Sequence, residues 1–363
     1  MALFKGRDRF LGIDISASAV KLVELSRNGQ RLQVEAVAME PLPEGTVEDR
    51  NPTDPEEVGA AIKRALKTSG THLKHAAVAV PTSSVITRTL PMPAEYGDDD
   101  IEASIQIEAA QYIPFPLEEI YIDFQVQAGS KALAETQEVM LVASRKEYVD
   151  LRADALSEAG LKPSIVDVEA YALENAYPIL EEGASASDVD GKRGATRVGD
   201  VRVALVDMGA TITTLYVFQE SKVIFAREQA FGGDQLTASI ADTYGLEKGK
   251  AELAKRSGEL SEDYPATILA PFKQSAAEQI GNALQFFFSS SHYNSVDKII
   301  LVGGGALVPG LAAEVARRLK IPTIIGSCFE QMGNATRVNR RGLLRDAPLY
   351  TVACGLAMRS FDA

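Results

Sequence analysis

The sequence predicts an α/β protein that contains an internal duplication. Residues 11–25 read as an apolar strand, an aspartate, a turn of small residues and a second strand, and residues 204–218 repeat this order. Apolar strands alternate with amphipathic helices around both hairpins, which is typical of sheets covered by helices. The chain has 363 residues, of which 46% are hydrophobic and 24% are charged. This length and composition are sufficient for two or three globular domains.

Strand and helix signals alternate after the first hairpin. A helix is expected to begin at the N-cap Asp54, followed by Pro55 and an acidic first turn, and to end at Gly70. The next expected elements are a strand at 76–80, a helix at 148–159, a strand at 165–168 and a helix at 169–177. Residues 181–200 are mostly Gly, Ala, Ser and Asp, which predicts a flexible boundary.

The second hairpin is followed by a mainly helical pattern. The expected elements are helices at 234–244, 246–256 and 271–292, a strand at 298–302, and helices at 311–320 and 347–359. The last of these helices is strongly apolar, so we expect it to pack back on the first domain.

Composition excludes several classes of protein. A net charge of −13 argues against generic nucleic-acid binding, which requires a basic surface. The longest apolar stretch without a charge, residues 299–313, contains three consecutive glycines and a proline. It is also shorter than the roughly 20 residues of a membrane-spanning helix. The basic N-terminal segment leads into a strand and not into an apolar run with a cleavage site, so we expect a cytoplasmic protein.

Cysteine and histidine are too few for a rich metal site. Cys328 and Cys354 lie apart in the sequence, and we expect free buried thiols in a reducing compartment, not a disulfide. His72 and His75 lack the spacing and companions of metal ligands, so we place them on the surface.

Negative charge is concentrated in residues 89–130. This segment has no lysine or arginine and contains nine carboxylates, namely Glu95, Asp98, Asp99, Asp100, Glu102, Glu108, Glu118, Glu119 and Asp123. Such a surface would attract a basic partner. The alternative is a solvated acidic helix face that binds nothing.

Asp14 and Asp207 are the first candidates for chemistry, because each stands where a strand meets a turn of small residues. Such turns let several backbone N–H groups converge on a phosphate. Two facing aspartates would hold a hydrated Mg²⁺ between them. Two unrelated hairpins with ordinary turn chemistry remain the alternative. Lys21 either reaches back toward a phosphate or is a solvated strand lysine.

A run of three glycines, residues 303–305, follows the strand 298–302 and precedes a helix. Glycine at such a place lets the backbone approach a flat ligand closely, or only lets the chain turn sharply. The chain contains neither a GxxxxGK[ST] loop nor the dinucleotide-binding fingerprint. The glycines are therefore weak signals by themselves.

The order of these features resembles that of the actin-like nucleotide-binding superfamily, which includes sugar kinases, heat-shock ATPases and the cell-division protein FtsA. The order is a hairpin with Asp14, a hairpin with Asp-x-Gly-x-Thr, Gly-Gly-Asp before a helix, Ala-Glu-x-x-Lys, and the triple glycine before Pro309. Within that superfamily the chain is similar to the PilM family of type IV pilus assembly proteins. Residues 105–119 and 167–173 carry the most specific similarity, which covers essentially the whole chain.

The resemblance implies an actin-like (ribonuclease H-like duplicated) fold with an FtsA-type inserted subdomain. The implied parts are a first domain (1–81, 158–200 and the C-terminal helix 347–363), an inserted acidic subdomain (82–157), a second domain (201–231 and 296–346) and its helical subdomain (232–295).

The resemblance also implies a site for ATP and Mg²⁺. Its residues would be Gly12, Asp14, Ser16, Ser18 and Lys21 in a first phosphate loop, Asp207, Gly209 and Thr211 in a second, Gly232, Gly233, Glu252 and Lys255 around ribose and base, and Gly303, Gly304 and Gly305 along the adenine. Asp14 and Asp207 would hold Mg²⁺ largely through water. Asp167 and Glu169 are the nearest candidates for positioning the attacking water. No glutamine occupies that stretch, so at most weak Mg-dependent ATPase activity is expected.

The implied partner is the N-terminal cytoplasmic peptide of the inner-membrane protein PilN. The chain would reach the inner face of the membrane only through this partner, and would link it to other pilus assembly proteins and motor components. Cytoplasmic tails beside membrane spans are rich in lysine and arginine. Glu118, Glu119 and Asp123 of the acidic segment are therefore the candidate contacts.

Three other functions are alternatives. A small-molecule kinase would need a substrate carboxylate as base and a substrate cleft. An FtsA-like filament tether would end in a basic amphipathic helix, and a secretion-system homologue would carry a fused membrane span. The apolar helix at 347–359 and the lack of a span favour the ATP-binding pilus scaffold.

Overall fold

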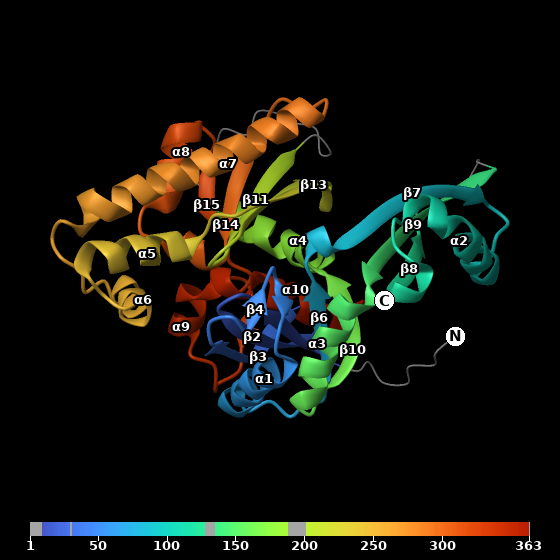
Figure 1. Cartoon of the computed structure of the whole chain (residues 1–363), viewed down its shortest axis with the longest axis horizontal. Coiled ribbons are helices and arrows are strands. Elements are labelled where there is room, and N and C mark those ends of the chain that lie inside the picture. Colours follow the sequence, from blue (N-terminus) through green and yellow to red (C-terminus); the bar gives the residue numbers. More distant parts are fainter. Residues whose placement is uncertain (1–8, 30, 128–134, 188–200, 363) are drawn as a thin grey trace.

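Two mixed β-sheets form the two halves of the molecule (Figure 1). The structure is a computed structural model that describes residues 9–29, 31–127, 135–187 and 201–362. The first sheet contains β1 (Leu11–Ile15), β2 (Ala19–Asn28), β3 (Arg31–Pro41), β6 (His75–Val80), β10 (Lys162–Val168) and β16 (Gly333–Asn334). The second contains β11 (Arg202–Met208), β12 (Thr213–Gln219), β13 (Lys222–Gln229), β14 (Lys298–Val302) and β15 (Thr323–Ile325). A short hairpin, β4 (Val47–Glu48) and β5 (Asn51–Pro52), follows β3.

The strand order confirms the predicted duplication. It is β10-β6-β1-β2-β3-β16 in the first sheet and β13-β12-β11-β14-β15 in the second. In both halves the central strand, β1 or β11, pairs antiparallel with the next strand of the chain and parallel with β6 or β14. Asp14 lies opposite Lys21 in one hairpin, and Asp207 lies opposite Thr214 in the other. Two unrelated hairpins would not produce the same order twice.

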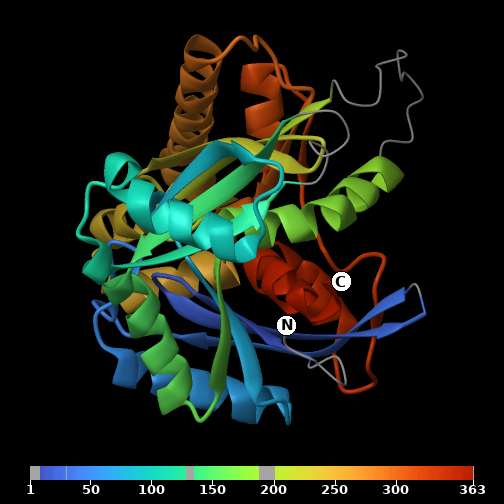
Figure 2. The same cartoon turned by 90° about the vertical axis from the view of Figure 1, so that its right-hand side faces the viewer.

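Helices cover both sheets. α1 (Pro55–Ser69) and α3 (Lys146–Glu158) share an apolar core with one face of the first sheet. α4 (Glu169–Ser187) and α10 (Thr351–Met358) lie against each other in a core that both sheets share, as Figure 2 shows at the centre of the molecule. A separate apolar core lies between the second sheet and four helices, namely α5 (Gly233–Tyr244), α6 (Lys248–Ser257), α7 (Ala270–Ser290) and α8 (Leu311–Leu319). α9 (Arg340–Arg345) precedes α10.

Two glycines allow α10 to pack closely on both sides. A Cβ added to Gly12 in β1 would lie 1.9 Å from the carbonyl oxygen of Ala353 in α10. On the opposite side, a Cβ added to Gly355 would lie 1.8 Å from the carbonyl oxygen of Ala172 in α4. Strand, helix and helix are therefore in backbone contact at the centre of the protein.

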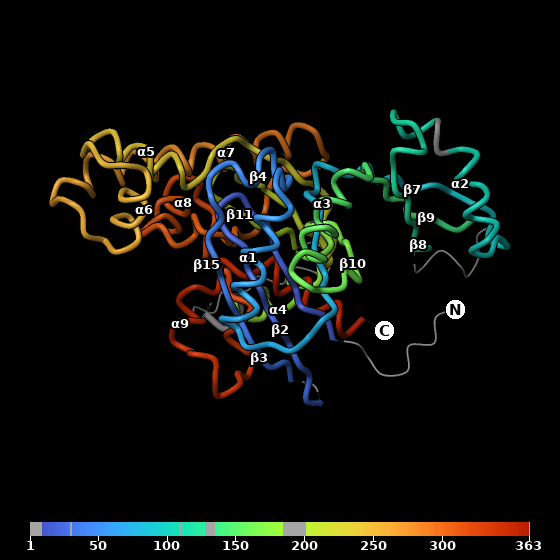
Figure 3. The backbone as a smooth tube through the Cα atoms, turned by 60° about the horizontal axis from the view of Figure 1, so that its bottom comes forward, coloured from blue at the N-terminus to red at the C-terminus, as the bar shows by residue number. Residues whose placement is uncertain are grey.

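A small unit with its own core projects from the first half. Its antiparallel sheet has the order β7 (Val85–Pro93), β9 (Thr136–Arg145) and β8 (Ile120–Val126), and α2 (Asp98–Tyr112) covers it. The core residues are Leu90, Met92, Ile101, Ile105, Ile113, Ile120, Val139, Leu141 and Ala143. Figures 1 and 3 show this unit on the side of the molecule opposite to α5 and α6. α3 packs on α1, outside this unit; the division into domains stays a prediction.

The expected helix boundaries are confirmed at α1 and wrong at α4. Asp54 caps α1 by accepting a hydrogen bond from the N–H of Glu57 at 3.0 Å, and Gly70 ends it with φ of 65°. α4 continues through Pro178 to Ser187, so the flexible boundary was predicted too early for residues 181–187. Tyr177 and Leu180, on either side of the proline, are buried in the shared core. Packing thus outweighs the hydrogen bond that proline removes; residues 188–200 lie outside the described residues.

Two further expectations concern the whole chain. Cys328 and Cys354 are both free and buried, as predicted. Across the described ranges, no helix is both long and apolar enough to cross a bilayer.

Candidate nucleotide site

The two hairpin turns have the same backbone hydrogen bond. Ser16 N–H donates to the carbonyl oxygen of Ala19 at 3.1 Å, and Gly209 N–H donates to that of Ile212 at 2.9 Å. The turn tips Ser18 and Thr211 are exposed to solvent. The sequence correspondence therefore extends to the geometry of the two turns, which end the central strands of the two sheets.

The Lys21 side chain is buried beside Asp14. Its Nζ donates to Asp14 Oδ2 at 2.7 Å and to Ser16 Oγ at 2.9 Å. Lys21 is only 8% exposed, so the alternative of a solvated strand lysine is wrong. The ion pair neutralises Asp14 and places a cation next to the first turn.

Asp207 lies at the end of β11 against the triple glycine. A Cβ on Gly303, whose φ is +79°, would lie 2.3 Å from Asp207 Oδ1, and a Cβ on Gly305 would collide with Met208. Burial raises the pKa of the Asp207 carboxyl above its usual range, Lys21 lowers it, and Asp14 raises it again. The two predicted aspartates are therefore close enough to influence each other's charge.

A second cation, Arg50, was missed by sequence reasoning. It lies in the turn between β4 and β5 and forms an ion pair with Glu169 at the start of α4. Its Nη1 donates to Thr214 Oγ1 and to Glu228 Oε1, each at 3.1 Å. We call Asp14, Lys21, Arg50, Glu169, Asp207 and Glu228 the central charged cluster. The sequence contains no local pattern that marks Arg50, because its partners lie far along the chain.

The predicted ribose and base residues meet at the start of α5. Gly233 N–H and Asp234 N–H donate to the carbonyl oxygens of Gly209 and Ala210, at 3.0 and 2.8 Å, which fixes the second turn against the helix. A Cβ on Gly232 would lie 2.4 Å from the carbonyl oxygen of Ala210, so only glycine fits there.

Two predicted residues of α6 extend this group. Lys255 Nζ forms an ion pair with Glu252 at 2.5 Å and donates to Thr237 Oγ1 at 2.7 Å and to the carbonyl oxygen of Gly233 at 3.3 Å. Gly233, Glu252 and Lys255 are thus brought together from α5 and α6, with Thr237 as a member that the sequence did not indicate.

Two predicted site residues lie elsewhere. Gly12 contacts α10 and not the turn. The buried Asp167 forms an ion pair at 3.3 Å with the half-buried Arg359, near the C-terminal end of the described chain. Of the two candidate catalytic carboxylates, Glu169 alone belongs to the central charged cluster.

A divalent cation would bind at this site only together with a nucleotide. Within the part of the chain that the structure describes, no three His, Cys, Asp or Glu side chains converge as a metal site. Asp14 and Asp207 are two carboxylates, and Mg²⁺ typically binds through one or two carboxylates, waters and substrate phosphates. The donor set therefore fits a hydrated Mg²⁺ that enters with a polyphosphate.

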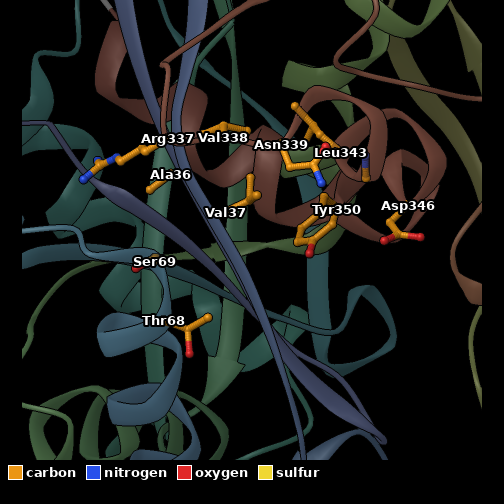
Figure 4. Close-up of a pocket in the computed structure, with 11 residues that line it drawn as sticks. Ala36, Val37, Thr68, Ser69, Arg337, Val338, Asn339, Leu343, Asp346 and Tyr350 are labelled. Carbon is orange, nitrogen blue, oxygen red and sulfur yellow. Dashed lines mark hydrogen bonds between the residues drawn. The ribbon is translucent and has the colours of Figure 1, made fainter.

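The cavity shown in Figure 4 is separate from the central charged cluster. It has a volume of about 450 Å³ and lies between β3, the end of α1 and the segment around α9. Arg337, Asn339 and Tyr350 contribute polar groups to its lining. It contains none of the predicted nucleotide-binding residues.

Changing Asp207 to Asn is expected to stabilise the nucleotide-free protein at neutral pH. Because the folded-state pKa of Asp207 is raised, its stabilising contribution is complete below the unfolded pKa of about 4 and is lost as pH rises through the folded pKa. Asparagine removes this loss. Urea unfolding should therefore give a higher midpoint for D207N than for wild type at pH 7.5, and equal midpoints near pH 4. Asp242→Asn, at an exposed position, is the control; a D207N midpoint no higher than wild type at pH 7.5 would contradict the prediction.

Comparisons with known proteins agree with this arrangement. The family described as type IV pilus assembly protein PilM matches residues 12–361. The chain is similar to the solved PilM-PilN type IV pilus biogenesis complex, with a TM-score of 0.78 and 27% identity over 98% of this chain and 100% of that one. It is similar in fold to ethanolamine utilization protein EutJ from Carboxydothermus hydrogenoformans, with a TM-score of 0.55 and 15% identity over 96% and 89% of the two chains. The predicted actin-like fold is thus confirmed. Because the family match includes both halves and the unit between them, the chain belongs to the PilM family of type IV pilus assembly proteins.

Proposed function

We propose that this protein is an ATP-binding scaffold of the type IV pilus inner-membrane assembly platform, and that it binds the N-terminal cytoplasmic peptide of PilN. The family match over residues 12–361 carries the proposal. The PilM-PilN complex, similar to this chain over nearly its full length, supports PilN as the partner. PilN would then hold the protein at the inner face of the membrane and join it to the other pilus components.

The central charged cluster supports the nucleotide part of the proposal. Two equivalent turns, each beside an aspartate, would hold the phosphates through their backbone N–H groups, with Lys21 as a neighbouring cation. Asp14 and Asp207 would hold Mg²⁺ through water. Glu169 pairs with Arg50, and no glutamine occupies the stretch around it to position the attacking water. We therefore propose at most weak Mg-dependent ATPase activity.

A direct test measures binding of a labelled PilN N-terminal peptide. Wild type and Asp207→Ala are each titrated with and without Mg-ATP. We expect wild type to bind the peptide and its affinity to change with Mg-ATP, whereas the affinity of D207A should not change. Absence of peptide binding in wild type would overturn the scaffold proposal. Equal peptide affinities in all four conditions would mean that the nucleotide does not control peptide binding and serves only as a structural ligand.

The acidic surface of the projecting unit gives a further prediction. Glu118, Glu119 and Asp123 are all exposed, next to the exposed rings of Phe115 and Tyr121. If they steer a basic peptide, reversing all three to lysine should lower peptide affinity by about tenfold, mainly through a slower association rate, and weaken its salt dependence. Binding kinetics at two salt concentrations measure both effects.

A matched control distinguishes a local effect from a change in net charge. Asp242, Glu259 and Glu262 are also exposed carboxylates, and they lie in the second half. Their reversal to lysine should leave peptide binding close to wild type. If both triple variants weaken binding equally, the acidic surface has no specific role.

A further inference from the structure

The turn between β4 and β5 has an unusual backbone for its residues. Asp49 has φ of 45° and Arg50 has φ of 65°, so two consecutive residues with side chains adopt the left-handed conformation. Two-residue hairpin turns of this kind normally contain glycine or asparagine. Glu220 and Ser221, in the turn between β12 and β13, have the same conformation, so the backbone alone does not mark a site. The contacts that hold the turn at Arg50 distinguish it.

A buried arginine holds this turn in place. Arg152 of α3 is only 1% exposed. Its Nη2 donates to the carbonyl oxygen of Arg50 at 2.6 Å, and its Nη1 donates to Asn51 Oδ1 at 3.0 Å and to the carbonyl oxygen of Tyr148 at 2.8 Å. These hydrogen bonds offset part of the cost of burying the guanidinium and fix the carbonyl group of Arg50 relative to α3.

The held turn directs Arg50 to a defined row of the second sheet. Asp207, Thr214 and Glu228 lie opposite one another on the adjacent strands β11, β12 and β13. Arg50 donates to Thr214 and Glu228, so its guanidinium lies one to two strand spacings, about 5–10 Å, from the Asp207 carboxylate. It also reaches Glu169 on the first half of the chain. Arg50 is therefore a cation at the junction of the two halves, on the side of Asp207 away from β14.

The partners of Arg50 suggest which ligand it would take. A guanidinium presents a planar fork of donors that matches carboxylate and phosphate oxygens equally well. In the central charged cluster, four carboxylates surround two cations, so an incoming polyphosphate needs a cation that can change partners. Lys21 pairs with one carboxylate, Asp14, of its own hairpin. Arg50 pairs with two carboxylates that come from the two halves of the chain, so a phosphate oxygen can replace a carboxylate oxygen at two positions.

We propose that Arg50 binds the terminal phosphate of a nucleoside triphosphate, exchanging its carboxylate partners for phosphate oxygens. This inference rests on the proposed nucleotide site and adds to it the residue that distinguishes a triphosphate from a diphosphate. The two hairpin turns hold the phosphates that ATP and ADP share. Arg50, on the Asp207 row, interacts only with the third.

The test is the ratio of Mg-ATP to Mg-ADP affinity, measured by titration calorimetry. Wild type should prefer ATP. Arg50→Gln should lower the affinity for Mg-ATP about ten- to a hundredfold, the value of a lost charged hydrogen bond, and leave that for Mg-ADP close to wild type. Arg50→Lys should retain part of the preference. Lys222→Gln, which removes an exposed cation of β13, should change neither affinity.

Each outcome decides one point. An equal loss of ATP and ADP affinity in R50Q, or no loss, overturns the role of Arg50 and leaves the nucleotide site intact. Wild type that binds neither nucleotide overturns the proposed site itself. If R50Q does not fold, Glu228→Gln replaces it: freeing Arg50 from one carboxylate should raise affinity for Mg-ATP relative to Mg-ADP, and an unchanged ratio overturns the proposal.

Discussion

Gly12→Ala is expected to prevent stable folding. The added Cβ would lie 1.9 Å from the carbonyl oxygen of Ala353 and 2.5 Å from the backbone nitrogen of Ala357, both in α10. The helix cannot retreat, because Gly355 on its other side already contacts the backbone of Ala172. Backbone on both sides leaves no flexible side chain that could move. The free energy of unfolding should fall by about 3 kcal/mol or more, which is at the upper end of the effects seen for overpacked cores.

Urea unfolding, followed by circular dichroism, measures this loss. Gly249→Ala is the matched control, because Gly249 lies in α6 with no atom within 4 Å of its added Cβ. There alanine should be neutral or stabilising by up to about 1 kcal/mol. The resemblance to actin-like proteins assigned Gly12 to a phosphate loop. A G12A variant with wild-type stability and reduced nucleotide affinity would support that assignment and contradict the packing role.

Asp207→Asn is expected to abolish Mg-ATP binding while the fold becomes more stable. The carboxylate is one of two that would hold Mg²⁺, and asparagine supplies only a neutral carbonyl oxygen in its place. The loss in affinity should be at least about a hundredfold, or about 3 kcal/mol. In a thermal unfolding assay, saturating Mg-ATP should raise the wild-type midpoint and leave that of D207N unchanged.

The two effects of this substitution have opposite signs, which makes the result decisive. If the D207N variant without ligand has a higher unfolding midpoint than wild type, its loss of Mg-ATP binding cannot result from general destabilisation. Asp242→Asn should behave as wild type in both measurements. If Mg-ATP still raises the unfolding midpoint of D207N, Asp207 is not part of the site, and Asp14 would be the one remaining candidate carboxylate for Mg²⁺.

Local patterns in the sequence predicted the parts of the site that depend on neighbouring residues. The repeated order of residues around Asp14 and Asp207 predicted two equivalent turns. This was possible because a strand, a turn of small residues and a returning strand depend only on residues close in sequence. The same holds for α1, whose N-cap and terminal glycine are in the sequence itself. The end of α4 was missed, because buried contacts of Tyr177 and Leu180 outweigh the effect of Pro178.

The sequence by itself determined the duplicated α/β architecture, the family resemblance and most of the residues around the two turns. Only the tertiary structure decided that Lys21 is buried against Asp14, that Gly12 packs on α10, and that Arg50 joins the two halves. Arg50 contacts Glu169, Thr214 and Glu228 across 119, 164 and 178 positions of sequence. No periodicity or spacing encodes such separations, since these contacts form only where the two sheets come together around α4 and α10.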